Sequence, residues 1–272
     1  MMLANPSEPF RIASLVQRYE AFAIDLDGVV WVGEQFVEGA AEAIASLREA
    51  GKTLLFVSNN AAYLPSRVVT RFREAGIEAE EREILTSAHA AREWIRREGL
   101  VGEKAFVLAS SPVPEQLADL LEIVPVEVGS RPSVVFVARD TGFNYRRLSA
   151  AAEAIRHGAV FAAANKDSVL PVPGGFEAGT GALVAAIEMA SGAKATVLGK
   201  PHPPMMQAAV RVLGRQGVLM IGDRADSDVA GARSVGWDAA LVLSGVTRPG
   251  DRVDPPPDYV MSSLGALARQ GR

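Results

Sequence analysis

Two carboxylates follow a short apolar run in the stretch AFAIDLDGVV, residues 21–30. The run at residues 21–25 is nearly continuous in apolar side chains, which favours a strand that is buried on both faces of a parallel sheet. Ligands bind outside the carboxyl ends of such strands. Because Asp25 and Asp27 stand at that end, this stretch predicts both a parallel sheet and the edge of the sheet where chemistry takes place.

Similar apolar runs recur along the chain and alternate with helical patterns. Further strand candidates are residues 53–58, 105–109, 134–139, 159–163, 195–198, 218–223 and 239–243. Helical periodicity fills the intervals at residues 40–50, 66–75, 88–98, 145–157, 181–191 and 204–216, and a glycine follows several of these helices, as is usual at a helix end. Such alternation predicts right-handed βαβ units. The predicted fold class is therefore α/β, with a Rossmann-like parallel-sheet core.

The composition limits the class of protein. The chain has 272 residues, enough for one large domain or two of ordinary size, and its 49% hydrophobic content can supply their cores. A net charge of −4 gives no basic footprint for a nucleic acid polymer. The absence of cysteine excludes disulfides, thiolate metal sites and a cysteine nucleophile.

Neither a signal peptide nor a membrane span is evident. The N-terminal residues lack the basic start and the apolar core of a signal peptide. No apolar run approaches the roughly 18–20 residues that cross a bilayer. We therefore expect a cytoplasmic protein with no membrane partner.

Reactive side chains follow four of the predicted strands. These endings supply carboxylates, a hydroxyl, backbone amides and one amine: Asp25 and Asp27; Ser58, Asn59 and Asn60; Lys200; and Asp223, Asp226 and Asp228. Such a set of groups is suited to phosphoryl transfer, because a carboxylate can attack phosphorus while a second one donates and then removes a proton.

A divalent cation is expected among these groups. Several anions repel a phosphate unless a cation joins them, and Mg²⁺ favours oxygen ligands from carboxylates, water and substrate phosphate. Asp25 and Asp223, on separate strands, are the expected ligand pair. Lys200 adds a fixed positive charge for the phosphoryl oxygens or the nucleophile. Ser58 and the amide of Asn59 can hydrogen-bond the phosphate at a strand–helix junction.

Taken singly, each motif has an ordinary structural interpretation. Asp-Leu-Asp-Gly is compatible with a turn, Ser58-Asn59-Asn60 with a turn and a helix cap, Gly-Lys-Pro with a loop, and residues 223–228 with a solvated helix start. What favours a functional interpretation is the combination. Four strand endings occur in this order, and each carries a group that the chemistry needs.

The order of these motifs resembles that of the haloacid dehalogenase (HAD) superfamily. The match is closer still to its subgroup of phosphatases similar to NagD and 4-nitrophenylphosphatase (type IIA, with a C2 cap). Those proteins carry Asp-x-Asp-Gly-Val, a paired Asn, Gly-Lys-Pro and Gly-Asp-Arg-x-x-Ser/Thr-Asp, and all of these occur here. Residues 140–145, 165–167 and 179–181 are similar to stretches of the cap in that subgroup.

The resemblance implies roles for the matched residues. Asp25 is expected to be the nucleophile and a metal ligand. Asp27 is expected to act as general acid and base and to give its backbone carbonyl to the metal. Lys200 is expected to stabilise charge and to contact the phosphate, and Asp223 to bind Mg²⁺. The resemblance is also compatible with a homodimer, since cap-mediated dimers occur among such proteins.

The remaining matched residues are expected to support these groups. The phosphate is expected to be held by Ser58, Asn59 and Asn60. Asp228 is expected to orient the ligands of the metal, with Asp226 assisting. One position departs from the subgroup, because Ala61-Ala62 stand where a hydroxyl or basic residue is common after the paired Asn. The specificity of a relative therefore cannot be transferred to this chain.

The long interval between Ser58 and Lys200 predicts an inserted domain. A βαβ unit needs roughly 30 residues, and about 140 separate these two. We expect a HAD-like core at residues 1–86 and 192–272, and a smaller α/β cap at residues 87–191. A cap over the carboxyl ends excludes water and contacts the leaving group. Its polar candidates for that contact are Asp140, Asn144, Asn165 and Asp167.

The sequence thus predicts a phosphatase that hydrolyses a small phosphate monoester. Sugar phosphates, nucleotides, phosphoglycolate and glycerol phosphate are all compatible with the subgroup. Two alternatives stay open at this point: a phosphotransferase or phosphomutase on the same scaffold, and a non-catalytic module that binds a phosphate ligand.

Overall fold

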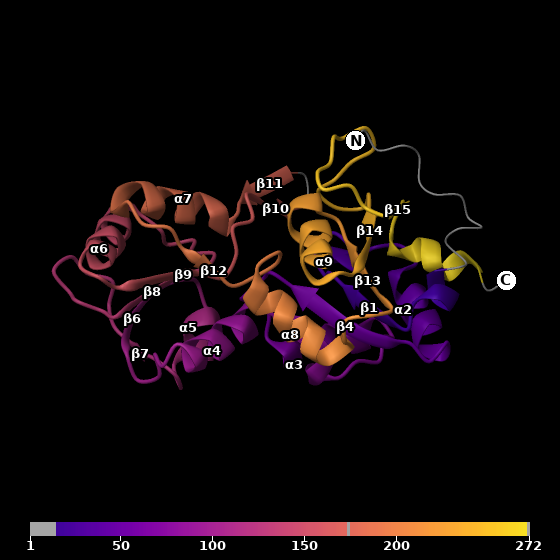
Figure 1. Cartoon of the computed structure of the whole chain (residues 1–272), viewed down its shortest axis with the longest axis horizontal. Coiled ribbons are helices and arrows are strands. Elements are labelled where there is room, and N and C mark those ends of the chain that lie inside the picture. Colours follow the sequence, from indigo (N-terminus) through magenta and orange to yellow (C-terminus); the bar gives the residue numbers. More distant parts are fainter. Residues whose placement is uncertain (1–14, 173–174, 271–272) are drawn as a thin grey trace.

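The computed structural model describes residues 15–172 and 175–270. Within these ranges the chain forms two parallel sheets with helices around them, in two lobes that lie side by side (Figure 1). The strand order is β15-β14-β13-β1-β4-β5 in the larger lobe and β12-β9-β8-β6-β7 in the smaller one. This architecture confirms the predicted α/β class, with a parallel-sheet core and a smaller α/β unit beside it.

β1 (Ala21–Ile24) lies in the middle of the larger sheet, between β4 (Thr53–Ser58) and β13 (Val218–Gly222). All three strands run parallel, and Ile24 pairs in register with both Phe56 and Ile221. Their carboxyl ends are therefore level, and the residues that follow them share one edge of the sheet. The outer strands are β5 (Ile84–Thr86), β14 (Asp238–Val242) and β15 (Tyr259–Met261).

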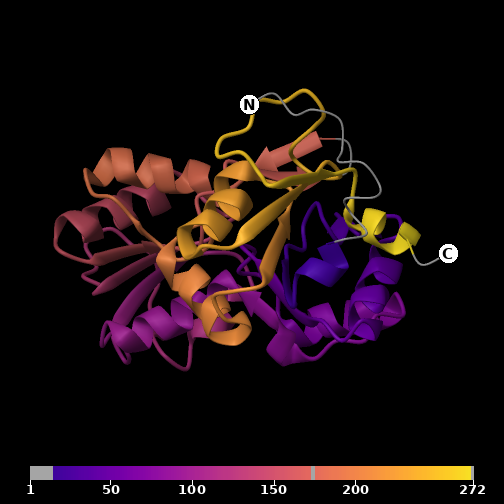
Figure 2. The same ribbon diagram turned by 45° about the vertical axis from the view of Figure 1, so that its right-hand side comes forward.

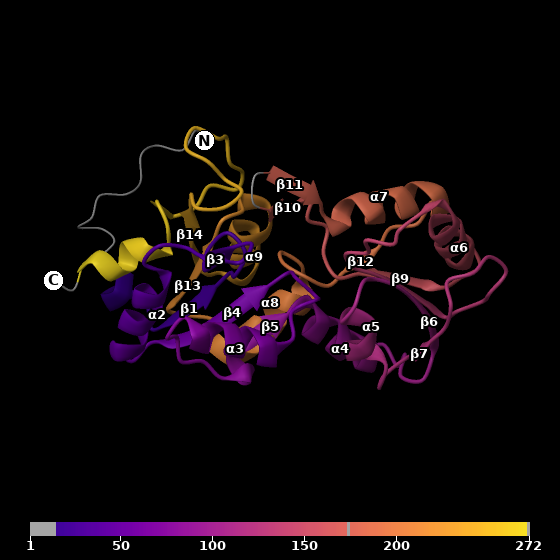
Figure 3. The same cartoon turned by 180° about the vertical axis from the view of Figure 1, so that it is seen from behind.

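Helices cover both faces of the larger sheet. Seen from behind, α2 and α3 lie on one face (Figure 3), where they bury the side chains of Phe22 and Ile24. The small side chains of Ala21 and Ala23 point to the opposite face, which packs against α8 and α9. Because successive side chains of a strand point to opposite faces, β1 contributes to the apolar layers on both sides of the sheet. The helix bounds are α2 (Ala40–Glu49), α3 (Pro65–Glu74), α8 (Pro203–Leu213) and α9 (Ala230–Val235).

The smaller sheet is also parallel and packs on its outer face against α6 and α7 (Figure 1). Its strands are β6 (Lys104–Leu108), β7 (Glu122–Ile123), β8 (Val134–Val137), β9 (Val160–Ala163) and β12 (Thr196–Val197). Its helices are α4 (Ser87–Arg97), α5 (Val113–Leu117), α6 (Tyr145–Arg156) and α7 (Thr180–Ser191). None of the helices in residues 15–172 and 175–270 is long and apolar enough to span a membrane.

The described chain also contains two antiparallel hairpins and three short helical segments. The hairpin of β10 and β11 projects from the smaller lobe toward the larger one (Figure 2). The sequence did not predict either hairpin, since their strands are too short to show a clear pattern. The bounds are β2 (Trp31–Val32), β3 (Gln35–Phe36), β10 (Val169–Val172), β11 (Gly175–Ala178), η1 (Glu81–Glu83), η2 (Ala225–Val229) and η3 (Leu264–Gln270).

One apolar cluster is shared by the two lobes. It joins Ala23 of β1 and Leu55 of β4 to Trp94 of α4 and Val107 of β6, all of which are buried. Apolar surface that is removed from water in this way stabilises the contact between the lobes. The cluster therefore favours a fixed placement of the smaller lobe at the edge of the larger sheet.

The run at residues 195–198 belongs to the smaller sheet, because β12 pairs with β9 in parallel. This differs from the predicted core range of 192–272. An apolar run shows that a strand is buried but not which sheet it joins. The division into a core and an inserted cap stays a prediction, and a boundary drawn by sheet membership falls after Val197.

Glu188 ties α7 to the segment that leads into β12. Its carboxylate accepts hydrogen bonds from Lys166 Nζ (2.7 Å), from Lys194 Nζ (3.0 Å) and from the N–H of Ala195 (3.0 Å). Burial opposes ionisation of this carboxyl, but the three donors together lower the pKa of Glu188 to about 2. The contact therefore stabilises the fold in the ionised state of Glu188.

Glu188→Gln is expected to lower the free energy of unfolding by about 1–2 kcal/mol at neutral pH. Because the pKa is lower in the folded state than the ordinary value of 4.5, this stabilisation is present above that value and is lost as the pH falls toward about 2. Urea denaturation of both proteins at neutral pH and near pH ~3 measures the difference. An effect of the same size at both pH values contradicts the prediction.

Candidate active site

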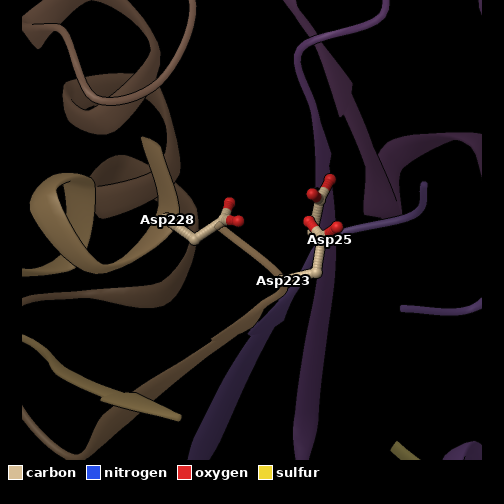
Figure 4. Close-up of side chains that lie close together, drawn as sticks. All are labelled: Asp25, Asp223 and Asp228. Carbon is tan, nitrogen blue, oxygen red and sulfur yellow. The ribbon is translucent and has the colours of Figure 1, made fainter. Parts of the chain in front are cut away.

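Asp25 and Asp223 stand at the carboxyl ends of neighbouring strands. Asp25 N donates to Ile221 O (2.9 Å) and so extends the β1 ladder, while Asp223 follows β13 directly. Asp228 reaches the same place from η2, and all three side chains are buried. Carboxylate oxygens of the three residues lie within 4.8 Å of one another (Figure 4). The structure thus brings together two predicted metal ligands and a predicted supporting residue.

Glycines permit this close approach. A Cβ on Gly222 would lie 2.1 Å from Cγ of Asp228, and a Cβ on Gly28 would lie 2.3 Å from Oδ2 of Asp223. Both distances are far shorter than a van der Waals contact. Gly28 also has a φ of 85°, in the region that favours glycine. The glycines that follow Asp27 and precede Asp223 are therefore explained by packing around the carboxylates.

Lys200 contacts two of these carboxylates and is itself buried. Its Nζ is 2.9 Å from Asp25 Oδ1 and 2.7 Å from Asp228 Oδ1, and it donates to Val57 O (2.7 Å). The ammonium has three donors, and each has a partner. Lys200 follows β12 of the smaller sheet, so it enters the site from the other lobe and not from a fourth strand ending of the larger sheet.

The electrostatics of the cluster depend on burial. Burial raises the pKa of Asp25, although Lys200 opposes the shift. Burial and the neighbouring Asp228 raise the pKa of Asp223 to about 7. For Lys200, burial acts against the charged form, but Asp228 and Asp25 raise its pKa above the ordinary value. One ammonium thus faces three carboxyl groups, and burial shifts two of them, Asp25 and Asp223, toward their protonated forms.

The donor set fits a divalent cation. Asp223 Oδ2 accepts a hydrogen bond from Val246 N (2.6 Å), whereas Oδ1 is buried without a hydrogen-bond partner in the described part of the chain. A buried carboxylate oxygen without a partner costs free energy. Carboxylate oxygens are the ligands that hard divalent ions prefer. A metal ion at this cluster would give the Asp223 oxygen a partner and would stabilise the ionised forms of the carboxyls that burial disfavours.

Asp27 is held by two aromatic residues that the sequence analysis did not identify. Tyr63 donates from its hydroxyl to Asp27 Oδ1 (2.7 Å), and Trp31 Nε1 lies 3.3 Å from the same oxygen. Burial raises the pKa of Asp27 even though both donors act against the shift. Burial and the carboxylate of Asp27 likewise raise the pKa of Tyr63, so Tyr63 keeps its proton. Only the short distance of Tyr63 from the paired Asn in sequence could have suggested this contact.

Asn59 connects the two lobes. Its side chain pairs with the backbone of Lys200, accepting from Lys200 N (2.7 Å) and donating to Lys200 O (3.1 Å), and it also donates to Asp167 (3.1 Å). Its backbone oxygen accepts from Asn165 Nδ2 (2.8 Å). A Cβ on Gly199 would lie 2.5 Å from Asn59 Oδ1, which explains the glycine before Lys200. The side chain of Asn59 therefore stabilises the contact between the two lobes.

Ser58 and Asn60 lie at the same strand end as Asn59. Ser58 is buried at the end of β4, and its Oγ accepts from Asn60 N (3.1 Å). Asn60 Oδ1 in turn accepts from Ala62 N (3.0 Å) and so fixes the turn that leads to α3. Both residues line the same cavity as Asp25. Their predicted contact with phosphate is compatible with these positions and stays a prediction.

The four polar candidates of the smaller lobe separate into two pairs. Asn165 and Asp167 reach Asn59, and Asp167 lines the cavity. Asp140 instead pairs with Arg147 (2.9 Å), and Asn144 caps α6 by accepting from Arg147 N (3.1 Å). Neither Asp140 nor Asn144 is among the residues that line the cavity. Loops are rich in Asn and Asp that only stabilise turns and caps, so sequence cannot separate the two kinds.

A small cavity connects these groups to the surface. Arg224, next to Asp223 in sequence, lies at its wall, and its guanidinium pairs with Asp226 (3.0 Å). The carboxylate of Asp226 is mostly exposed and lies outside the cluster of Asp25, Asp223 and Asp228. The cavity is lined by Asp25, Asp27, Ser58, Asn59, Asn60, Asp167, Val169, Leu170, Asp223, Arg224 and Val246.

Comparison with known proteins identifies the family. Residues 22–120 match the family model of haloacid dehalogenase-like hydrolases, and residues 197–267 match a second model described as HAD-hydrolase-like. The chain is 30% identical over 253 residues to the acid sugar phosphatase of Staphylococcus aureus, which covers 92% of this chain and 96% of that one. The chain belongs to the haloacid dehalogenase-like hydrolases.

Solved structures place this hydrolase in the predicted subgroup. The glycerol phosphate phosphatase of Mycobacterium tuberculosis, in complex with magnesium, superposes with a TM-score of 0.82 at 32% identity, covering 93% of this chain and 77% of that one. NagD from E. coli superposes with a TM-score of 0.78 at 28% identity, covering 91% and 97%. These similarities confirm the NagD-like subgroup and an enzyme of the phosphatase class.

Proposed function

We propose that this hydrolase is a magnesium-dependent phosphatase that cleaves a small phosphate monoester through an aspartyl-phosphate on Asp25. The proposal depends on one observation, the cluster around Asp25. Its Oδ1 is held by Lys200 Nζ (2.9 Å) and by the N–H of Leu26 (2.8 Å), which leaves Oδ2 to attack phosphorus. A carboxylate that is oriented in this way is a competent nucleophile.

The proposed ligands of Mg²⁺ are Asp25, Asp223 and the backbone carbonyl of Asp27, and the bound ion offsets the repulsion between the phosphate and the carboxylates. Asp228 is proposed to support the site through its contact with Lys200 (2.7 Å). Asp226 is proposed to assist through its ion pair with Arg224 (3.0 Å), which lines the cavity.

The chain's own residues account for both halves of the reaction. Asp25 Oδ2 attacks phosphorus, the bond to the leaving oxygen breaks, and Asp27 gives that oxygen its proton. Water then attacks the phosphorus of the aspartyl-phosphate and gives a proton to Asp27, which releases inorganic phosphate and restores Asp25. The phosphate is held by the hydroxyl of Ser58, by the backbone N–H of Asn59 and by Asn60, while Lys200 stabilises the charge on Asp25.

The proposed substrate is a sugar phosphate or glycerol phosphate. Support comes from the relatives, which are named acid sugar phosphatase and glycerol phosphate phosphatase. Most of the residues that line the small cavity have polar or charged side chains, which is compatible with a hydroxylated leaving group. Phosphate release from a panel of monoesters tests this class: glycerol phosphate, a hexose phosphate, a nucleotide and phosphoglycolate.

The same assay separates hydrolysis from transfer to a second acceptor. Hydrolysis releases inorganic phosphate and alcohol in equal amounts. Transfer to another sugar releases the alcohol while labelled phosphate appears in a new ester. Free alcohol without an equal amount of free phosphate contradicts the phosphatase proposal and favours a phosphotransferase, whereas an isomeric ester with neither product favours a phosphomutase.

Removal of divalent cations is expected to abolish turnover and to lower Tm. Mg²⁺ at about 100 times its Kd stabilises the folded state by about 2.7 kcal/mol, which corresponds to a rise in Tm of about 5–10 °C for a chain of this size. Asp223→Asn is expected to remove most of this rise, because it removes the negative charge of one of the two carboxylates that are proposed as ligands. Thermal unfolding with and without Mg²⁺ measures it. Asp119→Asn, at an exposed ion pair with Arg92, is the matched control.

A further inference from the structure

The carboxylate of Asp27 is anchored on one side only. Its Oδ1 accepts a hydrogen bond from the hydroxyl of Tyr63 (2.7 Å) and lies 3.3 Å from Trp31 Nε1. The same indole N–H lies 3.1 Å from the Tyr63 oxygen, so the three groups form a closed triangle. Within residues 15–172 and 175–270, no hydrogen bond reaches the other oxygen, Oδ2, and Asp27 lines the cavity.

We propose that Tyr63 is a positioning residue, whose hydroxyl fixes Asp27 Oδ1 so that Oδ2 is the oxygen that exchanges the proton with the leaving group. The inference rests on the proposed function, in which Asp27 is the general acid and base. Tyr63 does not contact the phosphate in this proposal. It acts through the orientation of Asp27 alone.

The triangle is rigid enough for this task. Trp31 is fully buried, and its ring packs edge-on against Tyr63 and Phe72, with centroid distances of 5.8 and 5.5 Å. The guanidinium of Arg71 lies over the Trp31 ring, 4.0 Å from its centroid, and it donates to Gly33 O (2.8 Å). Aromatic packing and the cation–π contact hold the indole in one orientation. The hydroxyl of Tyr63 therefore has a fixed partner on each side.

The local sequence gives Tyr63 this position. Ala61 and Ala62 follow the paired Asn and carry no polar side chain, so the Tyr63 hydroxyl is the first side-chain donor after Asn60. The turn that Asn60 closes through Ala62 N brings Tyr63 back toward β1. The loop after Asn60 thus supplies a hydrogen bond to Asp27, and its donor is the hydroxyl of Tyr63.

The chemical consequence concerns the leaving group. In the first step the bond between phosphorus and the leaving oxygen breaks, and a proton moves from Asp27 Oδ2 to that oxygen. An alkoxide such as that of glycerol is a poor leaving group and depends on this proton, whereas nitrophenolate is a stable anion and depends on it little. Misplacing Oδ2 therefore slows the first step, which kcat/KM reports, far more for alkyl phosphates than for nitrophenyl phosphate, whereas the second step is common to both substrates.

Tyr63→Phe tests the proposal, since it removes the hydroxyl and keeps the ring against Trp31. We expect kcat/KM for glycerol phosphate to fall by about 10- to 100-fold, and kcat/KM for nitrophenyl phosphate to fall by less than about 3-fold. The ratio of the two values does not depend on how much of the enzyme is folded, so partial unfolding cannot imitate the result. The control is Tyr259→Phe, which removes a hydroxyl that contacts Tyr19 (3.1 Å) away from the site.

Equal losses for the two substrates in Tyr63→Phe overturn the inference, as does a change of ratio of the same size in Tyr259→Phe. Asp27→Asn, measured in parallel, separates this failure from failure of the proposed function. Full turnover of glycerol phosphate by Asp27→Asn overturns the role of Asp27 itself. Loss of turnover in Asp27→Asn with equal losses in Tyr63→Phe overturns only the role of Tyr63.

Discussion

Asp25→Asn is expected to lower kcat by more than about 10⁴-fold while the protein stays folded. The amide matches the carboxylate in shape but cannot attack phosphorus. It can still accept from the N–H of Leu26, and Lys200 keeps its contacts with Asp228 and Val57. Turnover of nitrophenyl phosphate measures the loss. Acid quenching after reaction with labelled substrate is expected to trap phosphate on the wild-type protein and none on the variant.

The control for this substitution is Asp119→Asn. It makes the same chemical change at an exposed aspartate that pairs with Arg92, and we expect kcat to change by less than about 2-fold. Covalently bound phosphate in Asp25→Asn, or a loss of less than about tenfold, assigns the nucleophile to another residue.

The larger lobe and half of the candidate site were predictable from short stretches of sequence. Asp25, Ser58 and Asp223 each end an apolar run, and the runs become β1, β4 and β13, which are neighbours in one parallel sheet. The carboxyl ends of parallel strands necessarily share an edge. Strand order therefore did not have to be known to expect these three residues close together.

The position of Lys200 does not follow from this argument about neighbouring strands of one sheet. The prediction that it joins the cluster agrees with its contact to Asp25 (2.9 Å), but the strand before it belongs to the smaller sheet. Hydrophobic patterning shows burial and does not show which of two sheets receives a strand. The proximity of Lys200 depends instead on the pairing of its backbone with Asn59, a contact across 141 positions of the chain.

The sequence also did not predict which side chains of the site contact one another. Apart from its closeness to the paired Asn in sequence, Tyr63 gave no signal as a partner of Asp27, since the contact depends on a turn that Asn60 closes. Asp140 and Asp167 look alike as polar loop residues in the sequence. Only the structure shows that Asp140 pairs with Arg147 while Asp167 lines the cavity.

Lys200→Met is expected to destabilise the metal-free protein by about 3–5 kcal/mol and to lower kcat by at least about 100-fold. Methionine fills a similar volume without the charge. Asp25 and Asp228 then remain buried without their cation, and Val57 O loses its donor. Urea denaturation in the absence of divalent ions measures the first effect, and turnover of nitrophenyl phosphate measures the second.

Mg²⁺ is expected to restore part of the stability of Lys200→Met but little of its activity. Mg²⁺ can offset the buried negative charge that the lost ammonium leaves, since it binds the same carboxylates. It does not replace the ammonium beside Asp25 Oδ1. The control is Lys104→Met, which removes an exposed lysine 3.9 Å from Glu122 and is expected to cost less than about 0.5 kcal/mol. If Lys200→Met costs no more than this control in metal-free buffer, the three carboxylates do not carry the buried charge on which the site depends.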